Sequence, residues 1–192
     1  MPRVHVVYAS RHGGTQEIAE RIAEVLRTSG AEVVVANAAD RPDARGFDAH
    51  VVGSGVYIGS WLKEGTEFLE RNRSALAQHP VWLFSSGPLP GSSKETDATA
   101  PLENALGPAE GPGSGGRRKI EALAAAIRPR DHRVFRGAYD PNDPPKSIPE
   151  RLVRLMPASK EILPAGDFRD WDDIEAWAHE IAEKLVPTVV AG

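Results

Sequence analysis

Residues 4–26 read VHVVYASRHGGTQEIAERIAEVL, and this stretch decides the fold. Residues 4–9 are mostly β-branched, aromatic or small and are followed by polar turn residues, which is typical of a buried strand. In residues 15–26 the apolar side chains recur with the spacing of a helix. A strand, a glycine turn and a helix in this order predict the first unit of a fold that alternates strands and helices.

The alternation of strand and helix continues along the chain. We expect further strands at residues 32–36, 49–53, 81–85 and 133–138, and further helices at residues 61–76, 117–127 and 170–185, with one weak helix between the second and third strands. The strands are apolar almost throughout, as strands covered by helices on both faces should be. The sequence therefore predicts an α/β fold, a single doubly wound domain over residues 1–192 with a five-stranded parallel sheet.

Two segments depart from this alternation. Residues 88–116 are rich in glycine, proline and serine and predict a long surface loop. Residues 140–166 contain several prolines and predict an irregular insert with a short helix at 150–156. The chain has no clear linker and no internal repeat, so we expect both segments to be insertions in one domain.

The composition narrows the classes of function. The chain has 192 residues, no cysteine and a net charge of −4. Without cysteine there are no disulfides, no thiolate zinc sites and no iron–sulfur clusters held by cysteine. The six histidines lack the spacing of metal ligands, so we expect no metal. The negative net charge gives no basic surface potential of the kind that attracts nucleic acid.

The hydropathy pattern bears on the location of the protein. No stretch approaches the ~20 apolar residues that cross a bilayer. The first apolar run is too short for a signal peptide and is not followed by a cleavage site. We therefore expect a cytoplasmic protein without a transmembrane segment, and the sequence leaves peripheral contact with a membrane and the oligomeric state open.

Three loops follow strands and combine glycine with hydroxyl side chains. In doubly wound sheets, ligands bind beyond the carboxyl ends of the strands. The candidate binding residues are Ser10, Arg11, His12, Gly13, Gly14 and Thr15 in the first loop, Ser54, Gly55, Val56, Tyr57, Ile58 and Gly59 in the second, and Ser85, Ser86, Gly87, Pro88 and Leu89 in the third. We find no obvious general acid or base and assign no catalytic side chain.

The first loop suits a phosphate. Its glycines allow backbone N–H groups to turn inward, and the start of the following helix adds further N–H groups and the positive end of a dipole. Ser10 and Thr15 offer hydroxyls, and Arg11 and His12 offer positive charge. The alternative is a glycine turn that binds no ligand. The loop matches neither the Walker motif nor the G-x-G-x-x-G dinucleotide fingerprint.

Aromatic and charged side chains near these loops have competing interpretations. Tyr57 is favoured as a platform on which a planar ring stacks, whereas Trp61 is favoured as a side chain that simply covers the edge of the sheet. The carboxylates of Asp170, Asp172 and Asp173 resemble a paired carboxylate site, but their place before the last helix favours N-capping and compensation of the helix dipole. The basic residues are interpreted as a solvated face, with a docking patch for an acidic partner or a carboxylated substrate as the alternative; they are Arg117, Arg118, Lys119, Arg128, Arg130, Arg133 and Arg136.

These loops, in this order, resemble those of the flavodoxin-like family. The chain most resembles the menaquinone-dependent protoporphyrinogen IX dehydrogenase type within that family. The similar stretches are YASRHGGTQEIA (residues 8–19), GSGVYIG (residues 53–59), FRGAY (residues 135–139) and the Asp170-Trp171 start of the last helix. The resemblance covers residues 3–87 and 133–185.

The resemblance implies a flavodoxin-like fold and FMN as cofactor, held by the three loops, in an oxidoreductase. Its implied partner is a small-molecule or quinone substrate or a redox protein. The insert after the fifth strand is Pro-rich and of mixed charge here, whereas in the dehydrogenase type it is basic and apolar, so protoporphyrinogen chemistry is implied less strongly than FMN. A one-electron carrier and a non-redox binding module on the same fold are the alternatives. Carriers of this fold tend to be strongly acidic, and a net charge of −4 favours the enzyme.

Overall fold

The computed structural model describes residues 1–57, 60–87, 114–140, 142–144 and 166–185. The strands are β1 (Arg3–Ala9), β2 (Glu32–Asn37), β3 (Ala49–Tyr57), β4 (Ser60–Trp61), β5 (Val81–Ser86), β6 (Asp131–Phe135), β7 (Ala138–Tyr139) and β8 (Gly166–Asp167). The helices are α1 (Gly14–Thr28), α2 (Lys63–Arg71), α3 (Arg73–Leu76), α5 (Ser114–Ile127) and α8 (Trp171–Leu185), with a 3-10 turn η1 (Ala38–Asp40).

Five strands form a parallel sheet in the order β2-β1-β3-β5-β6. The chain leaves β1 toward β2 on one side and returns to β3 on the other, so the strand order reverses between β1 and β3. At this point the helices that follow the two strands lie on opposite faces, and in doubly wound sheets ligands bind beyond the carboxyl ends of the strands at such a reversal. The predicted α/β fold with a five-stranded parallel sheet is confirmed.

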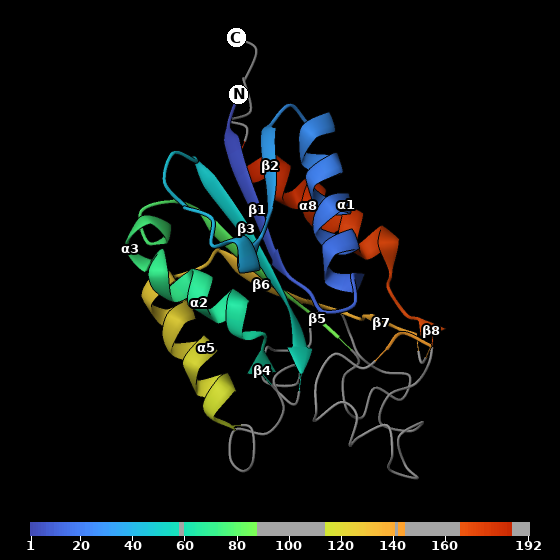
Figure 1. The fold of residues 1–192 in the computed structure, drawn as a ribbon. Coiled ribbons are helices and arrows are strands. Elements are labelled where there is room, and N and C mark those ends of the chain that lie inside the picture. Colours follow the sequence, from blue (N-terminus) through green and yellow to red (C-terminus); the bar gives the residue numbers. More distant parts are fainter. Residues whose placement is uncertain (58–59, 88–113, 141, 145–165, 186–192) are drawn as a thin grey trace.

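Helices cover both faces of the sheet (Figure 1). On one face, α1 and α8 pack side by side and bury a cluster that includes Ile18, Ile22 and Trp177. On the other face, α2 and α5 bury a cluster that includes Phe68 and Ile120. Burial on both faces explains why the central strands are apolar almost throughout.

Several element boundaries differ from the expectations. The weak helix expected between the second and third strands is only the three-residue turn η1. The helix expected at 61–76 begins at Lys63 and is interrupted at Asn72, whose side chain accepts a hydrogen bond from Ala44 N–H and donates one to Phe68 O. The interruption thus ties the helix to the loop before β3.

The fifth strand of the parallel sheet also ends earlier than expected. It stops at Phe135, and the chain then pairs again as β7, antiparallel to β8. A Cβ at Gly137 would lie 3.0 Å from Cα of Gly87, so the chain passes close to the end of β5 where it leaves the sheet. The helix expected at 117–127 begins earlier, at Ser114. The short helix expected at 150–156 and most of the loop expected at 88–116 lie outside the described residues.

Candidate functional site

The carboxyl ends of β1, β3 and β5 meet at one edge of the sheet, at the bottom of Figure 1. The register pairs Ala9 with Ser54, and Gly55 with Ser86. The three predicted loops therefore start next to one another, as parallel strands require. Of the predicted site residues, Ile58, Gly59, Pro88 and Leu89 lie outside the described residues.

The first loop forms a tight turn that opens α1. Gly13 has a φ of 87°, in the left-handed region that favours glycine. Ser10 Oγ accepts a hydrogen bond from Gly13 N–H at 3.0 Å, and Glu17 N–H donates to Gly13 O. Among the described residues, no side chain caps the start of α1. The first N–H groups of a helix have no acceptor within the helix, so this end can bind an anion.

The first loop lies against the end of β3. Thr15 is buried, and a Cβ at Gly55 would lie 3.3 Å from Thr15 Oγ1, so only glycine allows this approach without a shift of the neighbouring atoms. The Arg11 guanidinium lies 4.9 Å from the centre of the Tyr57 ring, and the His12 ring lies 6.5 Å from it. The structure thus brings the first two predicted loops together around Tyr57.

The second predicted loop is an extension of the strand rather than an irregular loop. Residues 54–57 continue β3, and Val56 and Tyr57 pair with Trp61 and Ser60 of β4 in a hairpin. The expected helical position of Trp61 is therefore wrong, although its side chain is buried against the sheet, in agreement with the interpretation that it covers the sheet. The Ser54 hydroxyl donates to Gly55 O and accepts from Leu62 N–H, which fixes the hairpin.

The third loop starts from a buried chain of hydrogen bonds. Trp61 Nε1–H donates to Ser85 Oγ at 2.8 Å, and Ser85 Oγ lies 2.9 Å from His132 Nε2. Burial lowers the pKa of His132 to about 4, so its ring is neutral at pH 7. In the tautomer with Nδ1 protonated, His132 Nε2 accepts a hydrogen bond from the Ser85 hydroxyl. The Ser85 side chain is thus engaged by Trp61 and His132, and its backbone lies in the sheet between β3 and β6.

Sequence reasoning predicted neither the contact of His132 with Ser85 nor the hydrogen bond from Trp61 to Ser85. His132 stands at the start of β6, in a segment without any motif or periodic signal. The backbone of the third loop is close to the second: a Cβ at Gly87 would lie 3.1 Å from Val56 O. Contacts between β3, β5 and β6 therefore set the shape of this part of the site.

The basic residues do not form a single patch. Arg117 is buried and pairs with Glu121 at 2.7 Å. Arg133, on the far side of the sheet, pairs with Asp173 at 3.0 Å. The expectation of one solvated face is therefore wrong for Arg117. The expected N-cap is confirmed, because Asp170 Oδ1 accepts a hydrogen bond from the N–H of the third residue of α8.

Comparison with models of known protein families identifies the family of the chain. The family model described as a flavodoxin domain matches residues 5–142, which is well over half of the chain. This chain belongs to the flavodoxin domain family.

Solved structures agree with the flavodoxin fold. Oxidised flavodoxin 1 from Bacillus cereus has a TM-score of 0.57 at 15% identity, covering 96% of this chain and 99% of that one. Flavodoxin 2 from the same organism gives 0.56 at 19% identity, with 95% and 99% covered. Rubredoxin oxygen:oxidoreductase from Desulfovibrio gigas gives a TM-score of 0.56 at 14% identity. The match covers 95% of this chain and 36% of that one. At such identities the likeness concerns the fold.

The described residues lack two kinds of feature. Within them, no helix is long and apolar enough to span a bilayer. In the same part of the chain, no three His, Asp or Glu side chains are grouped so that they could hold a metal ion. The uncapped start of α1 and its surroundings therefore remain the candidate site.

Proposed function

We propose that this chain binds FMN at the carboxyl ends of β1, β3 and β5 and acts as an FMN-dependent oxidoreductase. The observation that carries the proposal is the uncapped start of α1 beside Gly55 and Tyr57, in a chain of the flavodoxin domain family. When bound, FMN supplies electron or hydride transfer, and the protein orients the cofactor and tunes it.

The phosphate of FMN fits the first loop. The N–H groups at the start of α1 are donors that no described side chain caps, and a phosphate there is stabilised by the helix dipole as well. A Cβ at Gly13 would meet no atom of the described residues within 4 Å, so none of them fills the space beside the loop. Thr15 adds a hydroxyl next to Gly55, which agrees with the residues that the resemblance assigns to the phosphate.

The flavin ring fits beside Tyr57. The Tyr57 side chain is half-buried at the end of β3, and the Arg11 guanidinium lies over its ring. An aromatic side chain held by a hairpin offers a rigid surface for stacking. The backbone of residues 54–57 and 86–87 supplies N–H and C=O groups for the polar edge of the ring. These groups exclude water from one side of the flavin and orient it.

We infer the substrate class from the resemblance of the motifs around these loops. The first loop, the segment 53–59 and the segment 135–139 are similar to the protoporphyrinogen IX dehydrogenase type, which supports a tetrapyrrole or quinol-linked substrate. A one-electron carrier is the second candidate, because the solved structures named above include flavodoxins. The net charge of −4 favours the enzyme over the carrier.

A visible absorption spectrum tests the proposal. The purified chain is measured before and after addition of FMN and desalting, and we expect flavin bands at close to one FMN per chain. Anaerobic reductive titration then separates the two candidates: a single two-electron step supports the enzyme, whereas two separate one-electron steps support the carrier. If no flavin is retained and FMN fluorescence is not quenched on titration, the proposal is wrong and the fold serves as a non-redox binding module.

A further inference from the structure

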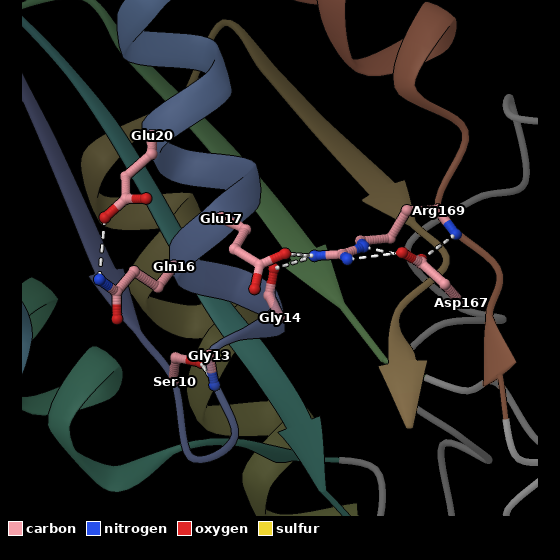
Figure 2. A network of polar contacts seen from close by, with 8 residues as sticks. All are labelled: Ser10, Gly13, Gly14, Gln16, Glu17, Glu20, Asp167 and Arg169. Atoms are coloured by element: carbon pink, nitrogen blue, oxygen red, sulfur yellow. Dashed lines mark hydrogen bonds and ion pairs between the residues drawn. The ribbon is translucent and has the colours of Figure 1, made fainter. Parts of the chain in front are cut away.

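Arg169 connects the segment before α8 to the start of α1. Its Nη1 lies 2.5 Å from Glu17 Oε2 and donates to Gly14 O at 3.4 Å (Figure 2). Arg169 and Glu17 are 152 positions apart in the sequence. The Arg169 side chain is only 8% exposed, whereas that of Glu17 is 55% exposed. A buried arginine therefore contacts the first turn of the helix that is proposed to bind the phosphate.

The guanidinium of Arg169 is held in place from its own side. Asp167 accepts from Nε and Nη2 at 2.8 and 2.6 Å, and the Trp171 ring centre lies 4.6 Å away. The hydrogen bonds to Asp167 raise the pKa of Arg169, so it stays charged. Because Arg169 is fixed by two neighbours along the chain, its contact with Glu17 is preorganised rather than formed by a flexible surface side chain.

The two-stranded sheet of β7 and β8, which carries Asp167, also contacts the first loop. β7 pairs with β8, and a Cβ at Gly14 would lie 3.8 Å from Ala138 N. The first residue of α1 thus lies against the backbone of β7, and Arg169, from the segment between β8 and α8, donates to the carbonyl of that residue (Figure 2). Both contacts act on the same turn of backbone.

Glu17 presents an electrostatic problem for a phosphate. Its carboxylate stands in the first turn of α1, where it is stabilised by the same dipole that a phosphate would use. Two anions at one helix end repel each other. A cation that pairs with the carboxylate removes most of that repulsion, and its effect is largest where water is partly excluded.

We propose that Arg169 is a positioning residue for the phosphate loop: it neutralises Glu17 and holds the Gly14 carbonyl, so that the N–H groups at the start of α1 can donate hydrogen bonds to a phosphate group. The inference rests on the proposed function, because it concerns FMN binding at that site. Arg169 itself does not touch the cofactor. Its effect should therefore depend on the charge of the ligand.

Titration with FMN and with riboflavin tests this inference, because riboflavin lacks the phosphate. Quenching of flavin fluorescence at low ionic strength gives the Kd of each ligand. We expect Arg169→Ala to weaken FMN roughly tenfold and riboflavin by less than about twofold, and we expect the difference to shrink at high salt. Arg21→Ala is the matched control, since Arg21 lies further along α1 and pairs with Glu24 and Glu175. It should leave both affinities unchanged.

A second set of variants separates charge from folding. Glu17→Gln removes the carboxylate and leaves Arg169 in place, so it should bind FMN at least as tightly as the unaltered chain. The double variant Arg169→Ala with Glu17→Gln should recover most of the FMN affinity that Arg169→Ala loses. The Glu17→Gln result can be read even if Arg169→Ala folds poorly, because Glu17 is largely exposed.

The outcomes are distinct. Two results would overturn the inference and leave the proposed function standing: Arg169→Ala weakens the binding of FMN and of riboflavin equally, or Glu17→Gln weakens the binding of FMN. In either case the contact between Arg169 and Glu17 only joins α1 to the segment between β8 and α8. If the unaltered chain binds neither ligand, the proposed function fails, and this inference fails with it. Selective loss of FMN affinity that is recovered in the double variant supports the inference.

Discussion

Trp61 donates a hydrogen bond from its indole nitrogen to the hydroxyl of Ser85 at 2.8 Å, inside the core between the sheet and α2 and α5. Trp61 belongs to the hairpin at the end of β3, and Ser85 belongs to β5. The bond therefore joins two of the three segments that form the candidate site. Since neither side chain is exposed, the join is part of the folded core and does not depend on a ligand.

Replacing Ser85 by alanine should destabilise the protein. Ser85→Ala leaves both Trp61 Nε1 and His132 Nε2 buried without this partner, and an unsatisfied buried polar group costs about 1–3 kcal/mol. Thermal or denaturant unfolding gives the change in the free energy of unfolding. The control is Ser74→Ala on the exposed side of α3, which should change it by no more than about 0.5 kcal/mol. Equal losses in the two variants would contradict the role of the buried hydrogen bonds.

Replacing Gly13 by alanine should weaken the phosphate site. Gly13 and Gly30 have φ values of 87° and 94°, and a Cβ at either position would meet no atom of the described part of the chain within 4 Å. Alanine at each should therefore cost a similar backbone strain, about 1–2 kcal/mol. Only Gly13 lies in the proposed phosphate loop, since Gly30 follows the other end of α1. FMN titration should show weaker binding for Gly13→Ala and unchanged binding for Gly30→Ala.

The stacking role of Tyr57 has its own test. Tyr57→Ala should weaken both FMN and riboflavin, by roughly three- to tenfold, because aromatic stacking contributes about 0.5–1.5 kcal/mol. Tyr57→Phe keeps the ring and should retain most of the affinity. Fluorescence quenching gives both Kd values. A loss confined to FMN would indicate instead that Tyr57 acts through the Arg11 guanidinium, which lies over its ring.

Buried histidines should make stability fall in acid. Burial lowers the pKa of His5 to about 4 and that of His50 to about 3, from an ordinary value of 6.5. Below pH 6.5 the unfolded chain takes up protons at these rings and the native state does not, so the free energy of unfolding falls as pH decreases from 6.5 to about 4. Each ring contributes at most about 1.4 kcal/mol per pH unit.

Unfolding measured at several pH values checks this dependence. His5→Phe keeps the ring stacked on Phe47, at a centroid distance of 4.2 Å in the native chain, and removes one titrating group. Its stability should therefore depend less on pH between 6.5 and 4 than that of the unaltered chain. His179→Gln, on the exposed face of α8, should retain the full dependence. An unchanged slope in His5→Phe would contradict the assignment of the acid sensitivity to this ring.

Much of the fold was predictable because the signals are local. The strand at residues 4–9 and the helix at residues 15–26 were read from apolar spacing, and β1 and α1 lie within a residue or two of these bounds. The end of β3 was not predicted. Its serine and glycine residues are typical of a turn, yet pairing with β4 and the hydrogen bonds of the Ser54 hydroxyl keep them extended.

The sequence by itself determined the α/β class, the parallel sheet and the segments that supply the candidate site, because apolar periodicity and glycine turns act over a few residues. Only the tertiary structure decided that Arg169 contacts Glu17, and that Ser85 lies between Trp61 and His132. These contacts join residues between 24 and 152 positions apart. Hydrogen bonds and ion pairs need atoms within a few ångströms of each other. Only the packing of the helices on the sheet brings residues so distant in the sequence to such short distances.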